Sequence, residues 1–404
     1  MRAKVAIFTL LCLISLSVFP LSVISVHAQT NGYKLLFSNR NIFTINVDGT
    51  DLTQLTSGSI TKSNPTWSAD GAYIAYVYNP EGIGAAPGHV AYRRSEDLNQ
   101  LWVMNSDGSN QQLIASRSSR FQWSPIDHRI AYFDGTFVNS DQSGLWVLDL
   151  ATQQRIKITD VGDLGFAWSP DGKFLVTTTG VMGHGPDTFF NGVILDIIDS
   201  ETTEGTYSQQ IECADCIPVW SPDGSHIMLK NQQTVMLLTN TGKLIFQIDG
   251  SDPMWAFHSH KVALINGQNL EVIELEEPSI RVRRLSDKAL FRPVWSPDNT
   301  KIIFIGPNNL DSSDYWRFYL VTRVEDERGN WNSAHTFIYS SAVGYGEGTF
   351  PLPVSWSTDS RYVAMEHSME GGSKGITVFD FSTGEQTLLL PQQPAYDISW
   401  QPLN

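Results

Sequence analysis

The chain has 404 residues, a formal net charge of −15, 41% hydrophobic residues and 17% charged residues. This hydrophobic content supports a large packed core and excludes a disordered chain. The acidic balance argues against nucleic acid or an anionic membrane surface as a partner, because both attract clustered lysine and arginine.

Residues 1–28 have the features of a secretory signal peptide. Arg2 and Lys4 precede an apolar run, and Val26-His27-Ala28 forms a cleavage motif that predicts a cut after Ala28. The apolar run is also about as long as a membrane span, roughly 20 residues, so an uncleaved anchor stays the alternative. We expect an exported protein that is periplasmic, at the cell surface or extracellular. Unless the signal is such an anchor, the mature chain has no membrane span.

The remainder of the chain, residues 33–404, repeats one pattern built on the string Trp-Ser-Pro-Asp-Gly. One unit contains the strand-like strings PTWS, AYIAYV, LWVMN and QQLI, with an Asp-Gly hairpin turn between the last two. Four strands in about 40 to 50 residues is the period of a β-propeller blade. The same place in each unit is held by what we call the framework tryptophans: Trp67, Trp123, Trp168, Trp220, Trp255, Trp295, Trp356 and Trp400.

The two ends of the repeat region complement each other. The chain finishes YDISWQPLN, which supplies a first strand, and the region after Tyr33 supplies a second, third and fourth strand. Joining them would complete one blade and leave no open sheet edge. We therefore predict a single closed all-β propeller with eight blades, and a monomer. Seven blades stay possible, because the Trp255 unit has lost its turn sequence and the Trp168 unit has an indistinct fourth strand.

The strings PVWSPDGSHIML, NPTWSADGAYIAYV and IFTINVDGTDLTQLT resemble the WD40-like (PD40) repeats of the TolB family. The resemblance spans essentially all of residues 33–404, and the shared residues are those of the blade framework. The stretch between Gln29 and Tyr33 is too short for the α/β domain that precedes the propeller in TolB, so we expect the propeller only. The resemblance implies a secreted propeller of a class that usually binds other proteins.

Three short motifs contain residue types that occur in catalytic or metal sites, and the first is the turn itself. Ser221-Pro222-Asp223-Gly224 pairs a serine with an acid, but proline, aspartate and glycine in this order favour a tight turn, and no histidine recurs at a fixed distance from the repeated serines. The sequence predicts no catalytic residue here.

His258-Ser259-His260 replaces that turn in its unit, and two histidines at this spacing are weak candidates for metal ligands. Cys213 and Cys216 form a single C-x-x-C, for which an exported protein favours a local disulfide over zinc.

Long insertions rich in glycine and aromatic residues fall mainly on the face of the propeller opposite the Trp-Ser-Pro-Asp-Gly turns. Loops on a rigid scaffold are where binding function concentrates, and aromatic and arginine side chains are typical interface anchors. The alternative is that these insertions are neutral and pack on themselves. The candidate binding residues are Tyr92, Arg93, Arg94, His184, Phe189, Phe190, Tyr315, Trp316, Tyr345 and Phe350.

These observations together predict an exported, non-enzymatic propeller that binds a protein or peptide through this loop-rich face, without a cofactor. The alternative is a metal-assisted enzyme or a glycan-binding protein that uses the central funnel, with His89, His184 and Asp187 as its converging groups.

Overall fold

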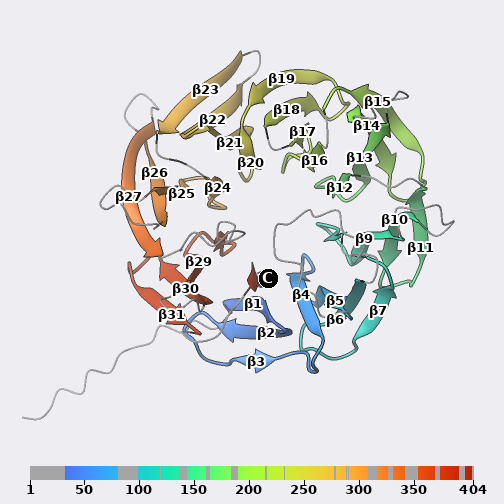
Figure 1. Cartoon of the computed structure of the whole chain (residues 1–404), viewed down its shortest axis with the longest axis horizontal. Coiled ribbons are helices and arrows are strands. Elements are labelled where there is room, and N and C mark those ends of the chain that lie inside the picture. The colour runs from blue at the N-terminus through green and yellow to red at the C-terminus, as the bar shows by residue number, and fades with distance from the viewer. Residues whose placement is uncertain are drawn as a thin grey trace, which may run out of the picture.

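The computed structural model describes residues 32–80, 99–118, 120–135, 143–160, 164–182, 190–213, 216–231, 233–276, 279–287, 289, 291–307, 316–325, 331–341, 354–368, 374–390 and 396–402. Within these ranges, 32 strands form eight four-stranded antiparallel sheets, which stand around a central axis as the blades of a propeller (Figure 1). The predicted eight-bladed all-β propeller is confirmed. In the same ranges, no helix has the length and apolar character that a membrane crossing needs.

The inner half of each blade consists of two strands, and every innermost strand ends at a framework tryptophan. The innermost strands of blades 1 to 8 are β32 (Tyr396–Trp400), β4 (Thr61–Trp67), β8 (Phe121–Trp123), β12 (Gly165–Trp168), β16 (Ile217–Trp220), β20 (Ser251–Trp255), β24 (Phe291–Trp295) and β28 (Val354–Trp356). The second strands, in the same order, are β1 (Lys34–Asn39), β5 (Tyr73–Asn79), β9 (Arg129–Asp134), β13 (Phe174–Met182), β17 (His226–Lys230), β21 (Lys261–Asn266), β25 (Lys301–Pro307) and β29 (Tyr362–Ser368).

The outer half of each blade consists of a third and a fourth strand. The third strands of blades 1 to 8 are β2 (Asn41–Asn46), β6 (Gln100–Asn105), β10 (Gly144–Asp149), β14 (Phe190–Asp199), β18 (Thr234–Thr239), β22 (Asn269–Glu276), β26 (Trp316–Glu325) and β30 (Lys374–Asp380). The fourth strands are β3 (Thr53–Gln54), β7 (Gln112–Ala115), β11 (Arg155–Thr159), β15 (Gly205–Ile211), β19 (Leu244–Asp249), β23 (Ser279–Ser286), β27 (Trp331–Ser341) and β31 (Gln386–Leu389).

Blade 1 closes the ring as the sequence predicts. β32, from the end of the described chain, pairs antiparallel with β1, with Leu35 opposite Trp400 and Leu36 opposite Ser399. The Trp255 and Trp168 units, whose repeat patterns are incomplete in the sequence, also form complete four-stranded blades, blades 6 and 4. In blade 6 the turn without the repeat sequence keeps one backbone contact of the others, a bond of 2.9 Å from the Ala256 N–H to the Lys261 carbonyl.

The hydrophobic core lies between the blades. Buried apolar residues form eight clusters, and each cluster joins one framework tryptophan to side chains of the preceding blade. Every framework tryptophan is at most 8% exposed. Burial of large apolar surfaces therefore holds each blade to its neighbour, and the ring forms when the eighth such interface closes.

Four framework tryptophans also bind the preceding blade through their indole N–H groups. Each one donates to the carbonyl of the residue that precedes the neighbouring framework tryptophan. These bonds are Trp123 to Thr66 at 3.2 Å, Trp168 to Gln122 at 3.1 Å, Trp255 to Val219 at 3.4 Å and Trp400 to Ser355 at 2.9 Å. In contrast, the buried indole nitrogens of Trp67, Trp220 and Trp356 have no hydrogen-bond partner among the described residues.

The first residue of each second strand, which we call the cover residue, lies over the framework tryptophan of the following blade at five interfaces. Measured to the ring centre, these contacts are Tyr73 to Trp123 at 6.4 Å, Arg129 to Trp168 at 5.2 Å, His226 to Trp255 at 6.4 Å, Lys301 to Trp356 at 5.9 Å and Tyr362 to Trp400 at 6.1 Å. Aromatic and cationic side chains both suit this position, because both interact favourably with an indole ring.

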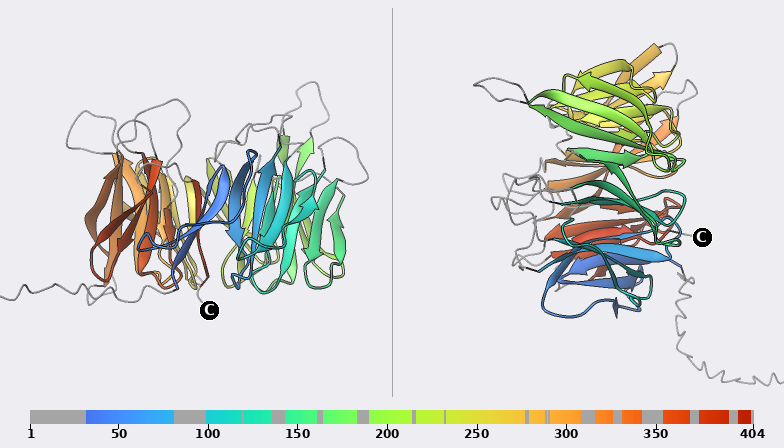
Figure 2. Two further views of the ribbon diagram at one scale, coloured as in Figure 1. Left: turned by 90° about the horizontal axis from the view of Figure 1, so that it is seen from below. Right: turned by 90° about the vertical axis from the view of Figure 1, so that its right-hand side faces the viewer.

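The alternation of strand direction gives the ring two different faces, seen from the side in Figure 2. The turn face carries the turns between first and second strands and between third and fourth strands. The loop face carries the connections between second and third strands and between successive blades.

The pairing of indole N–H groups predicts unequal effects of tryptophan-to-phenylalanine substitutions. Trp168→Phe removes a hydrogen bond between blades, whereas Trp220→Phe removes a buried donor that has no partner among the described residues. Since a net hydrogen bond contributes about 1 kcal/mol, Trp168→Phe should lower the free energy of unfolding by about 1 kcal/mol more than Trp220→Phe. Urea denaturation of both variants measures the difference, and an equal or larger loss for Trp220→Phe would contradict it.

Candidate functional site

The ten candidate binding residues are placed only in part by the structure. Phe190 and Trp316 begin β14 and β26, where only their backbone is described. The other eight, Tyr92, Arg93, Arg94, His184, Phe189, Tyr315, Tyr345 and Phe350, lie outside the described residues. The strands that flank the insertions end on the loop face, at Asn79, Met182 and Pro307. The binding role of the ten residues stays a prediction.

The repeated serine has a structural place in the turn. The Ser221 hydroxyl donates to Asp223 Oδ1 at 2.6 Å and accepts the backbone N–H of His226 at 2.9 Å, and Ser221 is 0% exposed. Gly224 follows with a φ of +72°, which a residue with a side chain rarely adopts. A buried hydroxyl with both of these partners cannot reach a substrate. Ser68, Ser169, Ser296 and Ser357 make the same two contacts.

The aspartate of the turn uses its second oxygen to bind the next blade. Asp70 Oδ2 lies 2.6 Å from His128 Nε2, and Asp223 Oδ2 pairs with His260 Nε2 in the same way. His260, a weak metal candidate from sequence, is thus engaged by the turn of the preceding blade. His258 is exposed and adopts a left-handed backbone. No group of three histidine, cysteine, aspartate or glutamate side chains suited to a metal occurs among the described residues.

Asp70 shows how these contacts affect ionisation. Burial favours its neutral form, but hydrogen bonds from His128, the Ala72 N–H and the Ser68 hydroxyl outweigh burial and lower the pKa of Asp70 from 3.8 to about 2. The pKa of Asp223 is lowered in the same direction, against burial, by hydrogen bonds from Ser221, Ser225 and His260. Both carboxylates are therefore ionised at neutral pH.

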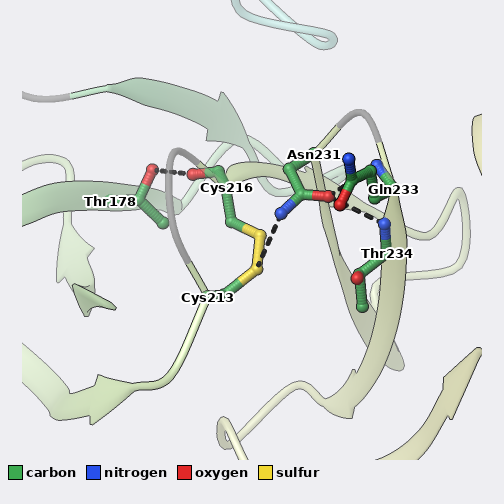
Figure 3. Close-up of a disulfide and its surroundings, with 6 residues drawn as sticks. All are labelled: Thr178, Cys213, Cys216, Asn231, Gln233 and Thr234. Carbon is green, nitrogen blue, oxygen red and sulfur yellow. Dashed lines mark hydrogen bonds between the residues drawn. A yellow bond between two sulfur atoms is a disulfide. The ribbon is translucent and has the colours of Figure 1, made fainter. Parts of the chain in front are cut away.

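Cys213 and Cys216 are joined by a disulfide in the link between β15 and β16 (Figure 3). Both cysteines are buried between blades 4 and 5. The Cys216 carbonyl accepts the Thr178 hydroxyl at 2.8 Å, and the Asn231 amide lies 4.0 Å from Cys213 Sγ. The disulfide therefore fixes the start of β16 on the loop face, next to the end of β17.

Four innermost strands contain a β-bulge near the axis on the loop face. In each, a polar residue three positions before the framework tryptophan has a left-handed backbone: Asn64, Asp252, Arg292 and Asp397, with φ values of 52°, 50°, 43° and 56°. We call these four residues the axial rim. Left-handed non-glycine residues cost on the order of 1 kcal/mol or more and occur often at functional sites, as bulges do.

The four rim residues fall into two pairs: Asp397 and Asn64 join two blades by hydrogen bonds, whereas Asp252 and Arg292 lie near a third charged residue, Lys230. Asp397 Oδ2 accepts the Asn64 N–H at 2.8 Å and the Ser38 hydroxyl at 2.9 Å, which ties blade 1 to blade 2. Asp252 and Arg292, in blades 6 and 7, lie within electrostatic range of Lys230. Burial lowers the pKa of Lys230, the Asp252 carboxylate opposes this, and Arg292 lowers it further. Two cations and one carboxylate thus gather beside the axis, where they can attract an anionic group.

Sequence reasoning missed the axial rim, although a signal for it exists. In three of the four strands the rim residue precedes a proline, in the strings Asn64-Pro65, Asp252-Pro253 and Arg292-Pro293. A polar residue followed by proline, two positions before the framework tryptophan, marks the bulge in these three strands. The electrostatic link to Lys230 has no such signal, because it joins three different blades.

Comparisons with known proteins show the fold alone. No protein-family model and no curated protein matches the sequence. The structure is similar to dipeptidyl peptidase 4 of Porphyromonas gingivalis, at 11% identity and a TM-score of 0.57, over 88% of this chain and 57% of the peptidase chain. A eukaryotic initiation factor matches at 11% identity and a TM-score of 0.56, over 92% of this chain and 98% of the other.

TolB from Acinetobacter baumannii also matches, at 14% identity and a TM-score of 0.42, over 91% of this chain and 66% of the TolB chain. The chain thus spans less than two thirds of the TolB and peptidase chains. At these identities the shared feature is the fold, and the activity of the other proteins does not transfer.

The depressed pKa of Asp70 predicts a dependence of stability on acidity. A carboxylate whose pKa falls on folding stabilises the protein above its unfolded value, near 3.8, and this contribution is lost as the pH falls through about 2. Asp70→Asn keeps the oxygen that the turn needs but loses the charge. The stability difference between wild type and Asp70→Asn should therefore be largest above pH 5 and vanish towards pH 2. Urea denaturation across this range measures it, and a constant difference would contradict the role of the ion pair.

Proposed function

We propose that this protein is an exported, non-enzymatic propeller that binds a protein or peptide partner through its loop face, around the axial rim. The observation that supports this most is the strained, polar rim in four of eight blades. Local strain of this kind persists only where the surrounding structure maintains it, and it concentrates at binding and catalytic sites. The resemblance of the repeats to the TolB family, whose propellers bind other proteins, points the same way.

The charges around Arg292 of the rim and the neighbouring Lys230 favour a partner with an acidic group. Lys230 is partly buried, Arg292 is exposed, and a single carboxylate, Asp252, lies with them. In a chain of net charge −15, such a cationic region differs from the average surface and would orient an acidic segment towards the axis. The predicted insertions with Tyr92, Arg93 and Arg94 would add anchors around this charged centre.

The proposal favours binding over catalysis because the repeated serines are buried in their turns, as described above. The alternative enzyme or glycan-binding site in the funnel depends on His89, His184 and Asp187, which lie outside the described residues. No feature of the described residues favours that alternative.

A charge reversal at the rim tests the proposal. We expect the full chain, used as bait, to capture a defined protein that Arg292→Glu binds at least about tenfold more weakly, since like charges at an interface repel. Arg281→Glu is the matched control, because Arg281 is an exposed cation on the outermost strand of blade 6. Affinities of the identified partner for the three proteins are measured by calorimetry. Equal affinity for Arg292→Glu and wild type, or no specific partner at all, would overturn the proposal.

A further inference from the structure

Blade 3 contains its own arginine site on the turn face. The cover residue Arg129 reaches across to blade 4, where its guanidinium lies 5.2 Å from the Trp168 ring centre. It donates to the Gly172 carbonyl at 2.7 Å and to the Ser200 hydroxyl at 3.0 Å. Its Nε donates to Asp127 of its own blade at 2.9 Å. Glu201 Oε1 of blade 4 lies 3.8 Å from Arg129 Nη1. One indole ring, one carbonyl, one hydroxyl and two carboxylates thus surround a single guanidinium.

The next interface, between blades 4 and 5, offers most of these groups without an arginine, although Thr241 stands where blade 4 has Glu201. Trp220, Gly224 and Asn240 stand where blade 4 has Trp168, Gly172 and Ser200. The turn of blade 4 also supplies a carboxylate, Asp171, one position before the place that Asp127 holds in the turn of blade 3. The backbone confirms the match: the Asn240 N–H bonds to the Ser225 carbonyl as the Ser200 N–H bonds to the Lys173 carbonyl. Trp220, Gly224, Asn240 and Asp171 all line one cleft of about 430 Å³.

The cover residue of blade 4 is Phe174, which packs against the apolar cluster that contains Trp220. Phe174 and Trp220 both line the cleft, and within the described chain no ring contact joins them. The indole nitrogen of Trp220, unlike that of Trp168, has no hydrogen-bond partner among the described residues. This interface therefore lacks both the cation over the tryptophan and the bond that holds the tryptophan to the preceding blade.

The charge of the cleft suits a cation. Asp171 and Asp223 both line it, and both have pKa values below the ordinary range of a carboxyl group: burial opposes the shift, and hydrogen bonds within the turns outweigh it. Asp171 Oδ1 is bound within its turn, while its Oδ2 lies 3.9 Å from the ammonium of the exposed Lys173, beyond hydrogen-bond distance. The Asp171 side chain is 53% exposed, so this oxygen can accept a new donor.

We propose that this cleft binds an arginine side chain presented by a protein or peptide partner. The guanidinium would stack on Trp220, donate to the Gly224 carbonyl and the Asn240 side chain, and pair with Asp171. Arginine fits better than lysine, because its planar fork can serve these acceptors together while its face lies on the indole. The site is on the turn face, so it goes beyond the loop-face function proposed above and does not depend on it.

The experiment compares two peptides, acetyl-Gly-Arg-Gly-amide and the same peptide with citrulline, which has the shape of arginine without its charge. Binding to the full chain is followed by the chemical shift of the Trp220 indole N–H, assigned with Trp220→Phe. We expect the citrulline peptide to bind at least about tenfold more weakly, because charge assistance and the cation–π contact are both lost. Equal binding of the two peptides, or no binding of the arginine peptide at about 10 mM, would overturn the proposal.

Two variants locate the site. Phe174→Arg places an arginine where blade 3 has Arg129, so it should fill the cleft from within and abolish peptide binding. Tyr73→Arg makes the same change at the cover residue of blade 2 and should leave binding unchanged. Asp171→Asn keeps the turn acceptor but removes the charge, and should weaken binding about three- to tenfold. Full binding by Phe174→Arg, or by Asp171→Asn if Phe174→Arg does not fold, would contradict the assignment.

Discussion

The contact between each framework tryptophan and the preceding blade is the interaction on which the ring depends. A single four-stranded blade exposes apolar side chains on both faces and cannot bury them alone. Each tryptophan covers part of that surface, and half of them add a hydrogen bond to a backbone carbonyl. Because the blades form a closed ring, each of them depends on two such interfaces, and the pairing of β32 with β1 completes the last blade. The stability and the shape of the molecule follow from repeating one contact eight times.

The repeat also explains how much the sequence could predict. Period, blade number and closure are visible in the chain, because every blade needs a tryptophan, a turn and four short strands at nearly regular spacing. The turns of blade 6 and the fourth strand of blade 4 were doubtful, yet packing between neighbours imposed the same structure on them. The axial rim and the cover residues could not be found in this way. The roles of these residues depend on contacts between different blades, such as that of Arg129 with Ser200, and no local sequence pattern predicts such contacts.

We expect binding sites at positions where a residue of one blade differs from the equivalent residues of the other blades. Most turn aspartates serve the ring, through the serine of their own turn and in blades 2 and 5 through a histidine of the next blade. Asp171 makes the same serine bond, but its outer oxygen, 3.9 Å from the Lys173 ammonium, lines a cleft. On the loop face, Asp252 and Arg292 depart from the apolar inner strands in the same sense. The two faces therefore present sites of opposite charge, an acidic cleft at one interface and the group of Lys230, Arg292 and Asp252 near the axis, which has two cations and one carboxylate.

The interface between blades 4 and 5 has a cleft beside its framework tryptophan, which we propose to be an arginine site. A crystal structure of the full chain with the acetyl-Gly-Arg-Gly-amide peptide tests this most directly. We expect an arginine guanidinium over Trp220, with nitrogen atoms about 2.7 to 3.0 Å from Asp171 Oδ2 and the Gly224 carbonyl, as in other charge-assisted bonds. Phe174 stacked on Trp220, with no space between them and no peptide in the cleft, would contradict it.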